Sequence, residues 1–206
     1  MKMCETFRSI QGEGLMIGSL TYFIRLSGCN LSCRWCDTKY SKEESYDMSV
    51  KDILKTVKGD KNICITGGEP LLQDEVYELM DELLKKDKNI VLETNGSIDI
   101  SKVPKDPRLM ISMDIKCPSS GMEEKMFMDN LKELKSTDQL KFIIENGEDF
   151  EYAITFLDES IRCSVIVCPV GGMDIEPLAE EVIERRLNVR VLPQLHKLIW
   201  GNKRSV

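Results

Sequence analysis

The chain has 206 residues, 42% of them hydrophobic, which is enough to bury one sizeable core, so we expect a single domain over residues 1–206. Its net charge of −7 argues against non-specific nucleic-acid binding, because such binding depends on neutralising phosphates. The first residues lack the apolar core of a signal peptide, and no apolar run reaches the roughly 18 residues that a membrane span requires. We therefore expect a cytoplasmic protein without a membrane partner, whose eight cysteines are reduced.

The hydrophobic pattern predicts strands and helices that alternate along most of the chain. Predicted strands cover residues 22–26, 63–66, 90–94, 110–116, 140–144, 165–168 and 189–192. Predicted helices cover residues 49–58, with Ser49 as the N-cap, and residues 74–86, 126–135, 150–157 and 177–186. This alternation favours a parallel sheet with right-handed crossovers.

Three cysteines follow the first predicted strand closely, Cys29, Cys33 and Cys36, with the spacing C-x3-C-x2-C. A [4Fe–4S] cluster normally takes four thiolates, so three would leave one iron open for chemistry. Zinc is the alternative, but it would need a fourth ligand from a distant part of the chain. The other five cysteines are most simply small core residues.

Further polar motifs follow the next predicted strands. The sequence Gly-Gly-Glu-Pro at 67–70 follows the second strand, Asn95-Gly96 follows the third, and Asp114 and Lys116 close the fourth. In parallel barrels the carboxyl ends of the strands supply the active site. We therefore expect these motifs and the cysteine loop to converge on one pocket.

Five segments together carry a family resemblance: SIQGEG at 9–14, TYFIRLSGCNLSCRWCDT at 21–38, TGGEPLL at 66–72, LETNG at 92–96 and the ending LPQLHKLIWGNKRSV. The chain resembles the radical S-adenosylmethionine (SAM) enzymes, and within them the 7-carboxy-7-deazaguanine synthase family. The resemblance implies an α/β fold, an incomplete, modified parallel barrel, and usually a homodimer.

The resemblance also implies the chemistry. A [4Fe–4S] cluster binds SAM at its open iron, and reduction by a donor such as flavodoxin or ferredoxin releases a 5′-deoxyadenosyl radical. The radical starts the conversion of 6-carboxy-5,6,7,8-tetrahydropterin to 7-carboxy-7-deazaguanine with loss of ammonia. Mg²⁺ supports this step, and the product enters the route to queuosine and related 7-deazapurines.

The resemblance assigns roles residue by residue. The expected metal ligands are Cys29, Cys33 and Cys36 for the cluster and Thr38 for magnesium. The expected cofactor contacts are Trp35, Cys36, Asp37, Gly68, Asp114, Ile115 and Lys116. The expected substrate contacts are Ile10, Gln11, Gly12, Arg25, Thr66, His196 and Val206. Glu93 is the expected catalytic residue, which orients the pterin or exchanges a proton.

Several of these residues have ordinary structural alternatives. Arg25 suits a bidentate grip on the substrate carboxylate, yet it is also a common kind of ion-pair arginine. Glu93, late in an apolar strand, either is paired structurally or faces the pocket, and a lone histidine such as His196 is usually structural. The segment Pro169–Gly172 departs from the family pattern, because Pro169 has neither a side-chain amide nor a backbone N–H for a cofactor contact.

Two other functions compete with the synthase. A radical SAM activase, which installs a glycyl radical on a partner protein, shares the cysteine spacing, but the QGEG start and the PQLHKLIWGNKR end favour a small-molecule site. A plain electron-transfer or structural metal protein would not need the motifs at the other strand ends.

Overall fold

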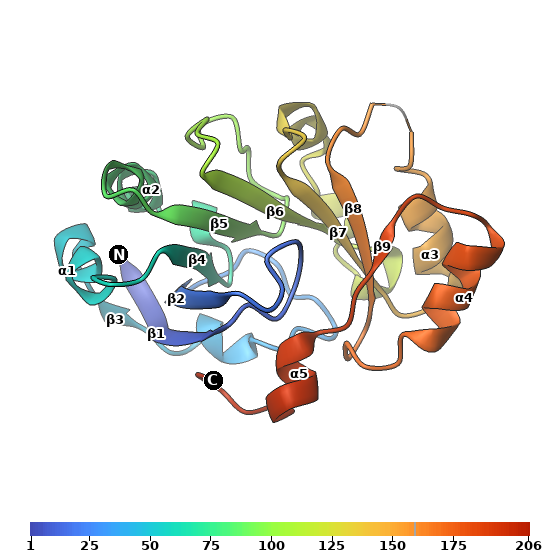
Figure 1. Cartoon of the computed structure of the whole chain (residues 1–206), viewed down its shortest axis with the longest axis horizontal. Coiled ribbons are helices and arrows are strands. Elements are labelled where there is room, and N and C mark those ends of the chain that lie inside the picture. The colour runs from blue at the N-terminus through green and yellow to red at the C-terminus, as the bar shows by residue number, and fades with distance from the viewer. Residues whose placement is uncertain (159) are drawn as a thin grey trace.

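The computed structural model describes residues 1–158 and 160–206. In this part of the chain nine strands form one open sheet in the order β3-β1-β2-β4-β5-β6-β7-β8-β9 (Figure 1). The strands are β1 (Lys2–Ile10), β2 (Leu20–Leu26), β3 (Tyr46–Asp47), β4 (Asn62–Gly67), β5 (Asn89–Thr94), β6 (Leu109–Ile115), β7 (Gln139–Ile144), β8 (Ser164–Pro169) and β9 (Arg190–Val191). Neighbours from β2 to β9 in this order are parallel, while β1 pairs antiparallel with β2 and β3. The predicted incomplete parallel barrel is confirmed.

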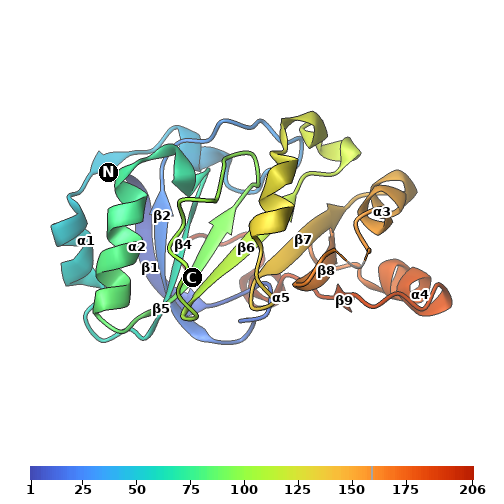
Figure 2. The ribbon, with the colours of Figure 1, turned by 90° about the horizontal axis from the view of Figure 1, so that it is seen from above.

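The described residues form five α-helices; four lie outside the curved sheet, and the fifth lies at its open side together with the C-terminus (Figures 1 and 2). The helices are α1 (Val50–Thr56), α2 (Glu75–Lys85), α3 (Gly147–Ile154), α4 (Glu176–Glu184) and α5 (Leu195–Trp200). Short 3₁₀ helices are η1 (Lys39–Lys42), η2 (Pro70–Leu72), η3 (Pro118–Ser120), η4 (Glu123–Lys125) and η5 (Met128–Glu133). This arrangement leaves the inner face of the sheet open to a cavity.

The predicted helix signals at α1 and α2 are confirmed. The Ser49 hydroxyl caps α1 by accepting a hydrogen bond from the Asp52 N–H at 3.2 Å, a contact typically worth about 1 kcal/mol. The apolar stripe of α2 is fully buried against the sheet, with Val76, Leu79 and Leu83 all 0% exposed. Burying each such side chain contributes about 1.5–3 kcal/mol, so the stripe fixes this helix to the outer face.

The helix predicted at residues 126–135 is wrong. The segment forms η5 and irregular turns, because the Asn130 amide donates to Gly96 O at 3.1 Å and to Ile98 O at 2.8 Å. The Phe127 N–H also donates to Gly96 O, at 3.0 Å. These bonds tie the segment to the loop after β5, and this tertiary context overrides the local helical pattern.

Other differences lie at element boundaries and chain ends. Helix α3 begins three residues earlier than predicted, because the Asn146 side chain caps it by accepting from the Asp149 N–H at 3.0 Å. The pattern predicts neither β1 nor α5, so the cysteine loop follows the second strand of the sheet rather than the first. Strand β1 adds an antiparallel neighbour to the parallel core.

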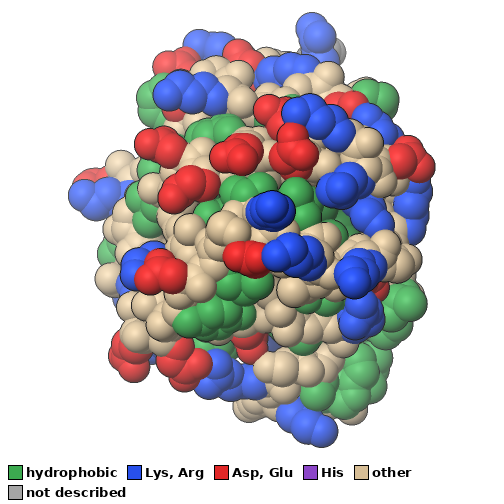
Figure 3. Space-filling view, turned by 90° about the vertical axis from the view of Figure 1, so that its left-hand side faces the viewer, with side chains coloured by type: hydrophobic (Ala, Val, Ile, Leu, Met, Phe, Trp, Pro, Cys, Tyr) green, Lys and Arg blue, Asp and Glu red, His purple; other side chains and the backbone are tan. Residues whose placement is uncertain are grey.

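The surface carries both signs of charge. Acidic and basic side chains are both present on the face that carries α1 and α2 (Figure 3). In the described part of the chain, no helix combines the length and the apolarity needed to cross a membrane.

Candidate active site

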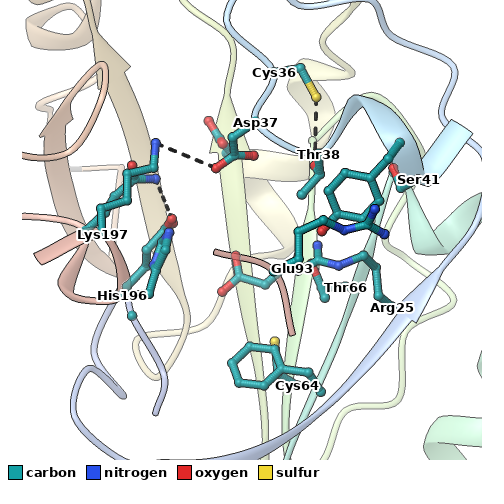
Figure 4. Close-up of a pocket in the computed structure, with 18 of the residues that line it drawn as sticks. Arg25, Cys36, Asp37, Thr38, Ser41, Cys64, Thr66, Glu93, His196 and Lys197 are labelled. Atoms are coloured by element: carbon teal, nitrogen blue, oxygen red, sulfur yellow. Dashed lines mark hydrogen bonds and ion pairs between the residues drawn. The ribbon is translucent and has the colours of Figure 1, made fainter. Parts of the chain in front are cut away.

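A cavity of about 580 Å³ lies on the inner side of the sheet, at the carboxyl ends of the parallel strands. His196 and Lys197 lie across this cavity from Arg25 and Thr66, with Glu93 between them (Figure 4). All but one of the predicted site residues line it, although they range from Ile10 to Val206 in the sequence. The expected convergence of the strand-end motifs on one pocket is therefore observed.

Ile115 is the exception among the predicted site residues. It is 1% exposed and packs in the hydrophobic core. Side chains alternate between the two faces of a strand, so Asp114 and Lys116 face the cavity and the residue between them does not. The side chain of Ile115 is therefore not available to a ligand in the cavity.

A row of polar side chains crosses the inner face of the sheet. Arg25 on β2 pairs with Thr66 on β4, while Glu93 on β5 pairs with Ser112 on β6, which pairs with Gln139 on β7. Thr66 and Glu93 come directly after two residues that pair between β4 and β5. They are therefore neighbours on adjacent strands, and the row is continuous. Neighbouring strands lie about 4.8 Å apart, so the backbones of Arg25 and Glu93, two strands apart, are separated by about 10 Å. The row thus places a cation at its β2 end and a carboxylate in its middle, on β5.

Arg25 is fixed through only one of its nitrogens. Its Nε donates to Glu5 Oε1 at 2.8 Å, and Glu5 also accepts from Tyr40 OH at 3.0 Å and from Ser205 Oγ at 2.6 Å. Burial alone would raise the pKa of Glu5, but the hydrogen bond from Ser205 and the charge of Arg25 lower it, so Glu5 is ionised. Within the described residues, neither terminal amino group of Arg25 has a hydrogen-bond partner. This fork is therefore available for a carboxylate.

Lys141 is the centre of a second charged group in the cavity. It is only 4% exposed, and its Nζ donates to Glu13 Oε2 and to Glu93 Oε2, both at 2.8 Å. Ser112 donates to the same Glu93 oxygen at 2.7 Å, and Gln194 Nε2 donates to Glu13 Oε1 at 2.7 Å. Burial alone would raise the pKa of Glu13, but the charge and the hydrogen bond of Lys141 lower it to about 2. Both of the alternatives for Glu93 are realised, since it is paired and it also lines the cavity.

The cysteine loop packs closely against the Gly-Gly-Glu-Pro loop. Cys29, Cys33 and Cys36 all line the cavity. A Cβ on Gly68 would lie 2.1 Å from Gly28 O and 2.6 Å from the Cβ of Cys29. Only glycine allows this approach of one loop to the other, so Gly68 determines where the cysteine loop lies.

The three cysteines of the loop all carry free thiols. Among the described residues, no three His, Cys, Asp or Glu side chains are grouped as ligands of one metal ion. In a [4Fe–4S] cluster each thiolate binds a different iron, so three thiols in one loop suit three corners of such a cluster.

Asp114 offers an unsatisfied acceptor beside the cysteine loop. Its Oδ2 accepts from Lys116 Nζ at 2.9 Å, while its Oδ1 is buried and has no hydrogen-bond partner among the described residues. A buried carboxylate oxygen without a partner is costly. A polar cofactor in the cavity would supply the missing donor, which fits the predicted contact to SAM.

The two ends of the chain meet at the cavity. The first N–H of α5 donates to Gly12 O at 2.9 Å, and a Cβ on Gly12 would lie 2.2 Å from His196 Nδ1. The guanidinium of Arg204 lies 3.5 Å from the ring centroid of Tyr40. Residues 201–206 therefore form part of the cavity wall, including Val206 at the end of the chain.

The segment Pro169–Gly172 holds Gln194. Gly172 has a φ of 70°, and its carbonyl accepts from the Gln194 N–H at 2.8 Å. A Cβ on Gly172 would lie 2.4 Å from the Cβ of Gln194. The two glycines of this segment thus allow the turn after β8 to pack against the start of α5. Gln11, a predicted substrate contact, is likewise held by the protein, since its Oε1 accepts from the Gly12 N–H at 3.0 Å.

The sequence reasoning does not predict a role for several of the groups that shape the site. Glu69 is 0% exposed and accepts hydrogen bonds from Leu71 N, Thr94 Oγ1 and Asn95 N, which ties the loops after β4 and β5 together. Lys141 also has no predicted role, although a lysine within the apolar run LKFII is a signal that could have indicated one.

Comparisons with known proteins identify the family. The Radical SAM superfamily matches residues 23–158. A 7-carboxy-7-deazaguanine synthase of Methanospirillum hungatei is 43% identical over 97% of this chain and 85% of its own length. One of Thermoplasma acidophilum is 39% identical over 98% of both chains. The chain belongs to the 7-carboxy-7-deazaguanine synthase family.

The solved structures agree with this family. The crystal structure of QueE from Escherichia coli aligns with a TM-score of 0.77 at 25% identity, over 95% of this chain and 94% of that one. SuiB of Streptococcus suis, with a TM-score of 0.62 at 16% identity over 83% of this chain and 48% of that one, shares the fold alone. Radical SAM enzymes use a [4Fe–4S] cluster and SAM, and the three thiols and the free Asp114 oxygen suit these two groups.

Proposed function

We propose that this protein is a radical SAM lyase that converts 6-carboxy-5,6,7,8-tetrahydropterin to 7-carboxy-7-deazaguanine with loss of ammonia. The structural observation that best supports this reaction is the polar row. The backbones of Arg25 and Glu93 lie two strand spacings, about 10 Å, apart, and both side chains line the cavity that the three cysteines also line. A carboxypterin has a carboxylate at one end and ring N–H donors at the other, so the charges of the row match both ends.

The cluster and SAM would be held at the cysteine-loop side of the cavity. Cys29, Cys33 and Cys36 would bind three irons, while Asp114 and Gly68 would contact SAM, with Trp35, Asp37 and Lys116 lining the same cavity. When bound, this pair supplies the 5′-deoxyadenosyl radical that removes a hydrogen atom from the substrate. The buried carboxylate of Asp114 gives the cofactor a fixed acceptor, which limits how it can lie.

The remaining residues would hold and orient the pterin. Arg25 would bind its carboxylate through two parallel hydrogen bonds. Within the described residues Glu93 Oε1 has no partner, because Ser112 and Lys141 both donate to Oε2, so Oε1 is available to accept from the ring or to exchange a proton. Further contacts would come from Thr66 and from the two chain ends, through Ile10, Gln11, Gly12, His196 and Val206.

Of the proposed bound groups, magnesium would have the fewest protein ligands. Its ligand would be the Thr38 hydroxyl, which lines the cavity 3.8 Å from Cys36 Sγ. Mg²⁺ commonly keeps several waters and binds few protein oxygens together with substrate oxygens. We further propose a cytoplasmic homodimer, reduced by a donor such as flavodoxin or ferredoxin, whose product serves the queuosine route.

Anaerobic reconstitution tests the proposal. The protein is loaded with iron and sulfide and given the carboxytetrahydropterin, SAM, Mg²⁺ and reductant, and the product is identified by mass spectrometry. We expect 7-carboxy-7-deazaguanine from the wild type, and from Cys33→Ala neither this product nor cleavage of SAM. An intact cluster that cleaves SAM without forming the deazaguanine would refute the proposal. Cleavage that depends on a partner protein would instead favour the glycyl-radical activase.

A further inference from the structure

Lys141 lies in a part of the sheet where a cation has little access to water. It sits in the middle of β7 between Leu140 and Phe142, which are both 0% exposed. Burying an ammonium group is costly unless opposite charges and hydrogen bonds compensate it. Glu13 and Glu93 provide this compensation, each at 2.8 Å from Nζ. All three side chains also line the cavity, so this costly arrangement lies at the substrate site.

The register of the sheet explains how one lysine reaches both carboxylates. Lys141 pairs with Asp114 on β6, two residues further along the strands than the Ser112–Gln139 pair. Its side chain therefore starts beside the polar row and reaches back to Glu93 on β5. Glu13 approaches from the loop after β1 and is held from its other side by Gln194.

Without the lysine the two carboxylates would face each other as like charges. Lys141 supplies one positive charge against two negative ones, and the donors Ser112 and Gln194 satisfy one oxygen on each glutamate. The group therefore keeps one net negative charge in the cavity. Such a site attracts neutral N–H donors and repels a carboxylate. Arg25 on β2, as a cation, attracts the carboxylate instead.

We propose that Lys141 is a positioning residue, which fixes Glu93 so that its free Oε1 accepts a ring N–H of the substrate; this inference rests on the proposed function. By the same contacts Lys141 determines which end of the substrate faces the carboxylates. The bound ligand class is a flat heterocycle with N–H donors at one end and an acid group at the other.

The test compares Lys141→Met with Lys135→Met in the reconstituted holoenzyme. Lys135 is a suitable control, because it is partly buried and hydrogen-bonded, to Leu109 O at 2.9 Å, but it does not line the cavity. We measure kcat and KM for the carboxytetrahydropterin, and separately the cleavage of SAM without substrate. For Lys141→Met we expect kcat/KM to fall about 10²-fold, mainly through KM, and this loss exceeds any loss of substrate-free SAM cleavage.

A second variant separates positioning from folding. Lys141→Met/Glu13→Gln removes one positive and one negative charge. Glu93 then no longer faces a second carboxylate, so we expect this variant to fold. The positioning role predicts that this variant still has a raised KM. A KM within about threefold of wild type in either folded variant would overturn the proposal. So would failure of both variants to fold while Lys135→Met folds, since Lys141 would then be structural. Loss of product in the wild type itself would instead refute the proposed function.

Discussion

Replacement of Arg25 by lysine separates the charge of this residue from its shape. Lysine keeps the positive charge, and its single ammonium can still pair with Glu5, which now accepts from Arg25 Nε at 2.8 Å. Lysine has no second pair of N–H donors in a fixed plane, however, so the two amino groups that are free in Arg25 are lost. The prediction is that Arg25→Lys folds normally but binds the carboxytetrahydropterin poorly.

The expected magnitude follows from the bonds that the fork can make. Each hydrogen bond to a charged group contributes about 1.5–3 kcal/mol, so two parallel bonds to the substrate carboxylate contribute about 3–6 kcal/mol. The side chain of Arg25 is 14% exposed, so water replaces part of the lost contact. We therefore take the lower end, about 3 kcal/mol, which corresponds to a roughly 10²-fold rise in Kd.

The assay is calorimetric titration of the substrate into the reconstituted protein with SAM and without reductant. Arg8→Lys is the control, because Arg8 makes with Asp60 the two-nitrogen contact proposed for Arg25 and the substrate, but is 55% exposed and does not line the cavity. A substrate analogue whose carboxylate is replaced by a carboxamide should bind the wild type and Arg25→Lys about equally. Binding of the natural substrate by Arg25→Lys within about threefold of wild type would refute the proposed role of the Arg25 fork.

Two further predictions concern the fold around the site. Gly68→Ala should reduce the iron and sulfide retained per chain after reconstitution, because its Cβ would lie 2.1 Å from Gly28 O; Gly59→Ala, where a Cβ meets no atom within 4 Å, should retain wild-type iron. Since the pKa of Glu13 is lowered from 4.5 to about 2, its ionised form stabilises the fold by about 3 kcal/mol above pH 5, and this is lost as the pH falls through 2. Glu13→Gln should therefore lose less stability than wild type in urea unfolding between pH 6 and pH 3, and equal losses would contradict the assignment.

Local patterns predict the parallel core of the fold well. Strand β2, the strands from β4 to β8 and the helices α1 and α2 follow from short apolar runs, an apolar stripe and one capping serine. The errors arise where distant contacts decide the backbone. Asn130 satisfies carbonyls of the loop after β5 and prevents the helix predicted around it. Strand β1 has few buried residues of its own, so its pairing with β2 leaves little trace in the hydrophobic pattern.

The predicted site residues that follow directly on a strand end line the cavity, whereas the contacts that form across the cavity are not predicted. Asp114 follows from its position, but a trio of neighbouring contacts at 114–116 ignores the alternation of side chains, and Ile115 is buried in the core. Nothing in the sequence pairs Glu5 with Arg25, or Glu13 with Lys141, because these partners are 20 and 128 residues apart. Such pairs form only when the folded chain brings the two residues together.

The cofactor side and the substrate side of the site draw their residues from different parts of the sequence. The superfamily match covers residues 23–158, which include the cysteine loop, Gly68 and Asp114. Many of the groups that face the proposed substrate, or that hold its ligands in place, lie outside that range, in the first residues and the last: Glu5, Glu13, Gln194, His196, Ser205 and Val206. The residues proposed to hold the cluster and SAM thus lie within the shared core, whereas the ends of the chain complete the wall of the cavity. On this reasoning, exchanging only the terminal segments between superfamily members should alter which substrate binds before it alters the cleavage of SAM.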